Sequence, residues 1–142
     1  MPYERVRSIT LPIDTAASAD IPQRRFVRMA STGIQLPADG GGGAAVPVIG
    51  VTLEAYDDSE HDAGNGLDQV PVALLDGAKI EVELGTEAIA VGGAVSTDAS
   101  GRAKPANAAA DEVLGVSLST VGAANAGTII TIIAMKSGND AV

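Results

Sequence analysis

Apolar and polar residues alternate along several short stretches of this sequence, as they do in a β-strand with one buried face. In the stretch 80–84, three aliphatic residues are separated by Glu81 and Glu83, so one face of the predicted strand is apolar and the other is acidic. The stretch 9–13 shows the same alternation. The stretch 129–135 is apolar at nearly every position, and we therefore expect it to be a central strand.

Turn-forming residues separate these stretches. Glycine, aspartate, serine and asparagine cluster at 76–77, 92–93, 97–101 and 137–140, and such clusters end strands and let the chain reverse its direction. Short strands separated by turns predict an all-β fold, either a small antiparallel β-sandwich or a barrel.

The sequence also contains an internal repeat, which indicates that the fold is built from two related halves. Residues 48–53 (VIGVTL) recur as residues 113–118 (VLGVSL). Further matching pairs lie in the same order on either side, namely 31–38 with 99–106, 70–74 with 131–135 and, more weakly, 9–13 with 80–84.

The repeat sets the predicted organisation of the chain. Half one covers about residues 5–77 and half two about residues 78–138 of a single domain, residues 1–142, with an extended N-terminal arm at 1–28. Each copy of the repeated hexapeptide is centred on a glycine, Gly50 or Gly115. A glycine in that place is typical of a buried strand that another backbone approaches closely.

The composition agrees with strands and limits the size of the core. Valine (14) and isoleucine (11) outnumber leucine (9), and β-branched side chains favour sheets over helices. Aromatic residues make up 2% of the chain and there are 17 glycines, so the core is built from small side chains. We expect an oligomer or a host surface to add stability.

The charge distribution excludes some classes of partner. Nine basic residues against 18 acidic ones give a net charge of −9, which argues against nucleic-acid binding because phosphate contacts need lysine and arginine. The chain has no cysteine, which excludes disulfides and thiolate metal sites. No apolar run has the length of a membrane span, and the first residues lack the pattern of a signal peptide.

The second half carries a recognisable order of motifs. Residues 88–95 (AIAVGGAV) are followed by a glycine-containing turn, the hexapeptide VLGVSL, a loop of small residues at 122–127 and the apolar strand 128–135. This order resembles the phage capsid cement proteins, or head decoration proteins, a family first catalogued as a domain of unknown function. The resemblance covers about residues 45–136, whereas the N-terminal arm and the acidic segment 57–68 depart from the family pattern.

The resemblance implies a function in the virion. It implies a compact β domain, often a homotrimer, that binds the outer surface of a tailed-phage head where subunits of the major capsid protein meet, and that stabilises the expanded shell. It also implies synthesis in the cytoplasm of the bacterial host, no enzymatic activity, no cofactor, and no nucleic-acid or membrane partner.

Arginines in the arm are the candidate contact residues. Residues 1–28 hold five arginines against three acidic residues, whereas the rest of the chain holds four basic and 15 acidic residues. Extended arms can add a strand to a neighbouring sheet, and arginine pairs with carboxylates across interfaces. We predict capsid or inter-subunit contacts for Arg5, Arg7, Arg24, Arg25 and Arg28, the alternative being a strand with ordinary solvated arginines.

The acidic segment 57–68 is the part of the sequence with metal-like chemistry. Asp58, Glu60 and Asp62 occupy alternate positions, as at the start of a calcium-binding loop. The glycine expected at the sixth position comes one residue late, and the twelfth position is not a glutamate. These departures favour a solvated surface loop, so no metal site is predicted.

Two residue patterns are partly similar to a catalytic triad and to a phosphate-binding loop. Ser59, His61 and Asp62 supply the residue types of a hydrolase triad, but one crowded loop does not give the separate platforms that triad geometry needs. The glycine run 40–43 lacks the lysine and the serine or threonine of a phosphate loop. We interpret it as a flexible hairpin tip or linker.

A second function from another class stays open at this point. The chain is alternatively a ligand- or receptor-binding β module of a virion surface fibre or of a secreted array, displaying the acidic segment. Binding to a glycan or receptor without shells would distinguish this function from a cement protein.

Overall fold

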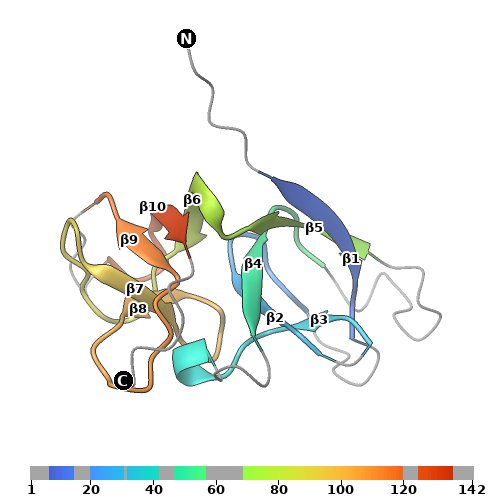
Figure 1. The fold of residues 1–142 in the computed structure, drawn as a ribbon, viewed down its shortest axis with the longest axis horizontal. Helices are drawn as coiled ribbons and strands as arrows, with labels where there is room; N and C mark the ends of the chain where they lie inside the picture. The colour runs from blue at the N-terminus through green and yellow to red at the C-terminus, as the bar shows by residue number, and fades with distance from the viewer. Residues whose placement is uncertain are drawn as a thin grey trace, which may run out of the picture.

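The computed structural model describes residues 7–14, 20–30, 32–41, 47–56, 69–119 and 125–135. Within these ranges the chain forms ten β-strands and one short 3-10 turn. The strands lie in two groups side by side along the long axis of the molecule (Figure 1). The predicted all-β fold is confirmed.

Each half of the chain forms one five-stranded sheet in which neighbouring strands are antiparallel. Sheet one, in the order β1-β5-β4-β2-β3, consists of β1 (Ser8–Pro12), β2 (Phe26–Met29), β3 (Ile34–Gln35), β4 (Val48–Thr52) and β5 (Gln69–Leu74). Sheet two, in the order β6-β10-β9-β7-β8, consists of β6 (Asp76–Glu83), β7 (Ala94–Thr97), β8 (Ala103–Pro105), β9 (Gly115–Ser117) and β10 (Ile129–Met135). Because β10 lies between β6 and β9, the prediction that 129–135 is a central strand is confirmed.

The two sheets have the same topology. Adding five to each strand number of sheet one gives the strand order of sheet two, and equivalent residues make equivalent pairs. Val27 pairs with Gly50 across β2 and β4, and Val95 pairs with Gly115 across β7 and β9. The prediction of two pseudo-repeated halves is therefore confirmed, with the hexapeptides 48–53 and 113–118 in equivalent places.

The structure corrects the alignment of the last strand in each half by one residue. Gly50 pairs with Leu74, and its equivalent Gly115 pairs with Ala134. Leu74 therefore corresponds to Ala134, whereas the sequence alignment had matched it with Met135. The error arose because aliphatic residues fill both strands, so a shift of one position leaves the apolar pattern almost unchanged.

A second correction concerns the short strands β3 and β8. Ile34 pairs with Met29, whereas Ala103 pairs with Thr97. Ile34 therefore corresponds to Ala103 rather than to Arg102. The turn between β7 and β8 holds one residue more than the turn between β2 and β3, and the shared glycines in these turns had concealed this insertion.

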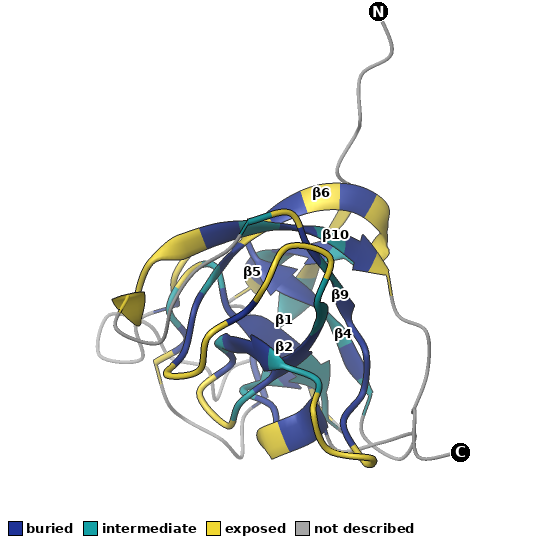
Figure 2. Ribbon diagram, turned by 90° about the vertical axis from the view of Figure 1, so that its left-hand side faces the viewer, coloured by how far each residue is buried: buried dark blue, intermediate teal, exposed yellow. Residues whose placement is uncertain are grey.

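Each sheet curls until its first and last strands meet. A parallel bridge joins Ile13, which follows β1, to Ile34 in β3, and an equivalent bridge joins Leu84, which follows β6, to Ala103 in β8. Ile13 and Leu84 are equivalent in the weaker sequence match, which these bridges confirm. The curl gives each sheet an inner face, and Figure 2 shows buried and exposed residues alternating along β6.

The buried residues form two clusters. One cluster lies inside sheet one and consists of Ile13, Ile21, Val27, Ile34, Tyr56, Val70 and Val72. The other fills sheet two and extends onto the outer face of sheet one, where Phe26, Val51 and Ala73 have no exposed surface. Since burial of apolar surface contributes roughly 25 cal/mol per Å², this shared core holds the two halves together.

Glycine is required at the centre of both repeated hexapeptides. A Cβ atom on Gly50 would lie 2.1 Å from the carbonyl oxygen of Ala73, and one on Gly115 would lie 2.6 Å from that of Ile133. Both separations are well below a van der Waals contact, so the close backbone approach predicted for these glycines is confirmed.

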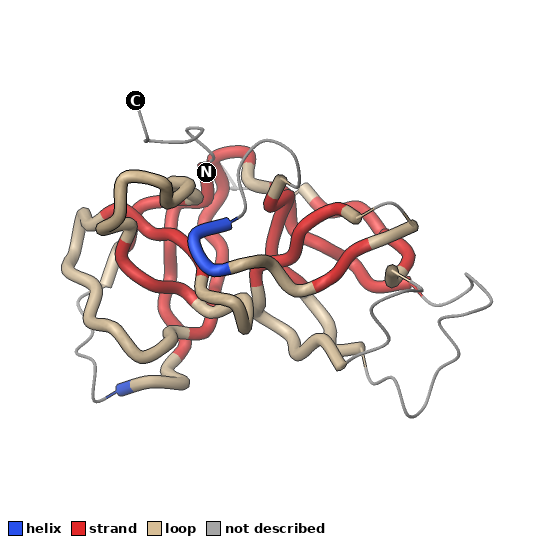
Figure 3. The backbone as a smooth tube through the Cα atoms, turned by 90° about the horizontal axis from the view of Figure 1, so that it is seen from below, coloured by secondary structure: helices blue, strands red, loops and turns tan. Residues whose placement is uncertain are grey.

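The described part of the glycine run, Gly40 and Gly41, differs from the interpretation as a flexible tip or linker, whereas Gly42 and Gly43 lie outside the described residues. Asp39–Gly41 forms the 3-10 turn η1, and Gly40 and Gly41 are buried in it. The N–H group of Glu112 donates a hydrogen bond of 2.9 Å to the Gly40 carbonyl. Viewed from below, η1 lies between the two groups of strands (Figure 3). The small size of glycine here permits close packing of the turn against half two.

Candidate interaction site

The predicted N-terminal arm contributes strands to sheet one. All of β1 and the first part of β2 fall within residues 1–28, so this basic segment is anchored in the sheet. Arg5 lies outside the described residues. The four other candidate arginines occupy different environments, and their surroundings determine which of them can face a partner.

Arg25 is directed into the molecule. Its guanidinium places Nη2 2.5 Å from Glu83 Oε2 and donates a hydrogen bond of 2.9 Å from Nη1 to the carbonyl of Ser100. Arg102 Nε lies 2.7 Å from the same oxygen of Glu83. Arg25 belongs to half one and its partners belong to half two, so the Glu83 carboxylate joins the two halves. The side chain of Arg25 is 10% exposed and that of Glu83 is 21% exposed.

Arg24 connects the halves through its backbone. Its N–H group donates to the Thr52 carbonyl at 2.8 Å, and its carbonyl accepts from the N–H group of Glu83 at 3.0 Å. The residue has a φ of +59°, in the left-handed region that residues other than glycine rarely adopt. These two hydrogen bonds hold that conformation and leave the half-buried side chain at the boundary between the halves.

Arg7 lies beside the first residue of β6, and Arg28 lies on β2. The Arg7 side chain is 79% exposed, and its Nε lies 3.3 Å from Asp76 Oδ2. Arg28 is half-buried on β2, and among the described residues its buried Nε has no hydrogen-bond partner. Arg7 is therefore the most exposed of the four, and capsid contact stays a prediction for the whole set.

A second charged cluster lies at the other side of the boundary and was missed in the sequence. Lys104 on β8 places Nζ 3.1 Å from Asp39 Oδ1 in η1 and 3.4 Å from Asp111 Oδ1. Burial lowers the pKa of Lys104. The hydrogen bonds that Lys104 makes with Asp39 and Asp111, together with the negative charges of these two residues, outweigh the effect of burial and raise the pKa above 10.5. Lys104 is therefore charged at neutral pH and forms a second ionic link between the halves.

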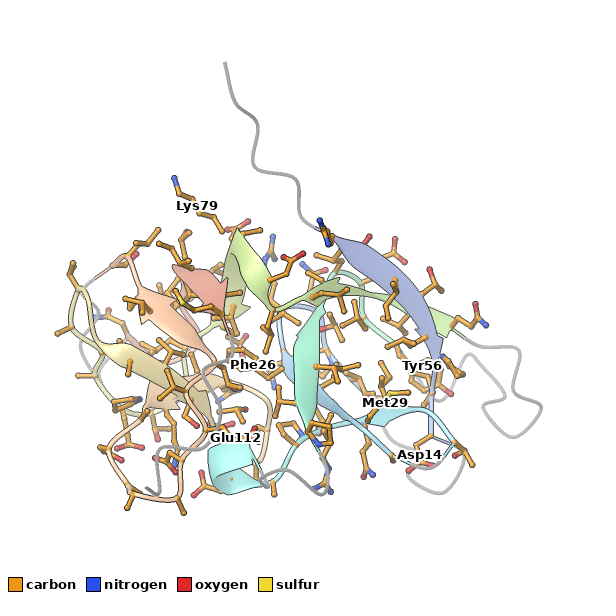
Figure 4. The ribbon with its side chains drawn as sticks, viewed as in Figure 1. Asp14, Phe26, Met29, Tyr56, Lys79 and Glu112 are labelled. Carbon is orange, nitrogen blue, oxygen red and sulfur yellow. The ribbon has the colours of Figure 1, made fainter. Side chains whose placement is uncertain are left out.

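The sequence carried no local signal for these two clusters. Glu83, the partner of Arg25, and Asp39, one of the two partners of Lys104, lie far along the chain, and an isolated charged residue in a turn or strand usually faces solvent. Figure 4 shows Phe26 on the side of β2 that faces half two, and Glu112 beside η1. The boundary therefore combines an apolar centre with ionic clusters around it.

The candidate metal and catalytic residues fall outside the described residues. Asp58, Ser59, Glu60, His61 and Asp62 all lie in the segment 57–68, which the structure does not describe. Across the described ranges, no three histidine, cysteine or acidic side chains come together in a way that could hold a metal ion. In the same ranges, no helix has the length and apolar character needed to cross a membrane.

Sheet two has an apolar surface on the side away from its core. It consists of Ala94, Val116, Leu118, Ile129, Ile133 and Met135, with the polar Thr131 between Ile129 and Ile133, and we call it the outer face of sheet two. Leu118, Ile129 and Met135 are 40%, 37% and 44% exposed, and the other three are half-buried. The apolar character of 129–135 predicted a central strand, but because it is nearly continuous it concealed which residues face outward.

Comparisons with known proteins identify a structural neighbour. No protein-family model and no curated protein matches the sequence. The fold is similar to the crystal structure of the N base of head fiber protein gp8.5 from bacteriophage phi29, with a TM-score of 0.57 and 17% sequence identity. The similarity covers 94% of this chain and 98% of the neighbour.

Proposed function

We propose that this chain is a non-enzymatic structural protein of a tailed-phage head. It binds the outer surface of the major capsid protein lattice and stabilises the expanded shell. The observation that supports the proposal most is the fold shared over nearly the whole length with a module of a phage head fiber. The family resemblance of the second half, which was found independently in the sequence, supports the same placement in the virion.

Adhesion without catalysis is sufficient for this function. A protein that binds the expanded lattice but not separated subunits stabilises each site by RT ln(1 + [L]/Kd), about 2.7 kcal/mol at a hundredfold excess over Kd. A shell contains many such sites, so modest contacts at each one add up. The two halves share one core, so the chain can act as a single rigid clamp, and we propose that it does so as a homotrimer.

The proposed capsid contact is the basic start of the chain. Arg7 extends into solvent beside β1, and Arg5 precedes it by two positions. Because the rest of the chain is strongly acidic, this end is the part suited to a negatively charged surface of the capsid subunit. Arg25 supports the contact indirectly, since it fixes β2 against half two.

Co-sedimentation with capsid shells tests the proposal. Shells assembled from the major capsid protein encoded with this chain are mixed with it in unexpanded and expanded forms, then pelleted. We expect the chain to pellet with expanded shells and to stay largely in solution with unexpanded ones. Failure to pellet with either form would remove the proposed function.

A charge reversal tests the contact surface. The double variant Arg5→Glu and Arg7→Glu should pellet with expanded shells at least about tenfold more weakly, because rim charges steer and hold a partner of opposite charge. The double variant Lys79→Glu and Lys136→Glu is the control, since it changes the net charge by the same amount at positions outside the basic start of the chain. Equal losses in both variants would mean that overall charge, rather than this surface, governs binding.

A fibre module is the second candidate function, and the structural neighbour favours it specifically. The neighbour is the N base of a head fiber, so this chain would attach to the head and present a receptor- or ligand-binding element. Glycan-array or host-cell binding measured without shells separates the two functions. A fibre module binds there, whereas a cement protein binds only in the presence of shells.

A further inference from the structure

Arg24 occupies the place in half one that Gly92 occupies in half two. Phe26 on β2 corresponds to Ala94 on β7, because each pairs with the residue that follows the central glycine of its hexapeptide. Arg24 and Gly92 each lie two positions before these residues. The repeat therefore places an arginine and a glycine at the same point of two modules that share one topology.

The two residues have the same backbone conformation and the same hydrogen bond. The φ angle is +59° at Arg24 and +77° at Gly92. The N–H group of Arg24 donates to the carbonyl of Thr52, and that of Gly92 donates to the carbonyl of Ser117, each at 2.8 Å. Thr52 and Ser117 hold the same position in the repeated hexapeptides. Both halves therefore need a left-handed residue at this turn.

Arginine is an unfavourable residue for this turn. A left-handed backbone brings the Cβ atom too close to the following carbonyl oxygen, whereas glycine has no Cβ atom and adopts the conformation freely. Across the described residues, Arg24 is the one residue other than glycine with a positive φ. Half two shows that the module accepts glycine at this point. Such strain is typical of positions at which the side chain has a function.

The Arg24 guanidinium is available to a partner. The side chain is half-buried, and within the described part of the chain it makes no hydrogen bond or ion pair. Its nitrogens are accessible to solvent, unlike the buried Nε atoms of Arg25 and Arg28. The N–H group of Glu83 donates to the Arg24 carbonyl, but Oε2 of Glu83 is already bound by Arg25 and Arg102. Arg24 can therefore receive a carboxylate from another protein.

We propose that Arg24 is a contact residue that binds a carboxylate of the major capsid subunit. A guanidinium binds a carboxylate through two parallel hydrogen bonds, and partial burial strengthens the pair because less water screens the two charges. The unfavourable backbone conformation is retained because it fixes the direction of this side chain. The inference rests on the proposed function and adds a second contact to the one proposed at Arg5 and Arg7.

Arg24→Gly separates the contact from the fold. Glycine removes the guanidinium and gives the turn the residue that half two has there, so we expect a urea midpoint at or above that of the wild type. In co-sedimentation with expanded shells over a range of concentrations, the same variant should bind at least about tenfold more weakly. Arg24→Lys keeps the charge but lacks the planar fork, so its affinity should lie between those of Arg24→Gly and the wild type.

Two control variants separate this contact from net charge and from the turn itself. Lys136→Gln removes the same charge at a position after β10 and should leave shell binding unchanged. Gly92→Arg places an arginine at the equivalent point of half two. Because the φ of Gly92 is +77°, this variant should have a lower urea midpoint than the wild type, with shell binding unchanged.

The outcomes distinguish this inference from the proposed function. Wild-type shell binding by Arg24→Gly, or an equal loss in Lys136→Gln, would overturn the inference and leave the proposed function in place. A urea midpoint of Arg24→Gly well below that of the wild type would also overturn it, because the arginine would then serve the fold. A wild-type chain that does not pellet with shells would remove the proposed function, and this inference with it.

Discussion

At the scale of single residues, charged side chains decide how firmly the two halves are joined. Glu83 accepts from Arg25 and Arg102, and Lys104 lies between Asp39 and Asp111. Arg25 and Lys104 are each mostly removed from water. Removing a carboxylate from either group leaves a buried cation with fewer partners, which costs more than the pair itself contributes.

Glu83→Ala tests the first cluster. Because Arg25 would lose its carboxylate partner while staying buried, we expect the free energy of unfolding to fall by about 2 kcal/mol, measured by urea denaturation. Glu81→Ala is the control, since Glu81 lies on the same strand but is exposed. Equal midpoints for the two variants would show that the Glu83 cluster does not hold the halves together.

The pH dependence of stability tests the second cluster. The folded-state pKa of Lys104 is raised above 10.5, so the folded chain holds this proton more tightly than the unfolded chain does. The stabilisation is fully present below pH 10.5 and is lost as the pH rises through the folded-state pKa. We expect the wild-type free energy of unfolding to fall more steeply above pH 10.5 than that of Lys104→Met, and parallel curves would contradict this account.

At the scale of elements, the sequence predicted where several strands lie, but it did not predict how the strands of the two halves align. Alternation along 80–84 and the glycine-centred hexapeptides follow from local backbone constraints, and the structure confirms both. The match of Leu74 with Ala134 depends on loop lengths and cross-strand pairing, which no local pattern records. The burial of Gly40 and Gly41 likewise depends on Glu112 and Asp111, which are distant in the sequence.

Gly115→Val tests the close approach between β9 and β10. A side chain there would meet the carbonyl of Ile133, so we expect a loss of about 2 kcal/mol or more in the free energy of unfolding, read from the thermal or urea transition. Gly92→Asn is the control, because nothing lies within 4 Å of its Cβ position and its φ of +77° suits asparagine. A wild-type transition for Gly115→Val would contradict the assigned register.

At the scale of the whole molecule, two copies of one module pack through unequal surfaces. The outer face of sheet one is buried against half two, whereas the equivalent face of sheet two is open. The sequence predicted the two halves, but it could not show this difference, because the same aliphatic residue types occur on both faces. The sequence also predicted the basic segment from its excess of arginine. It could not predict that Arg25 points inward, because that direction depends on how the two halves pack.

Attachment to the outside of a phage head is the central claim, and cryo-electron microscopy of expanded heads tests it most directly. Heads lacking the chain are imaged before and after incubation with it, and the two reconstructions are subtracted. We predict added density on the outer surface, above the places where major capsid subunits meet. Identical reconstructions, or added density confined to the inside of the shell or to the tail, would contradict the account.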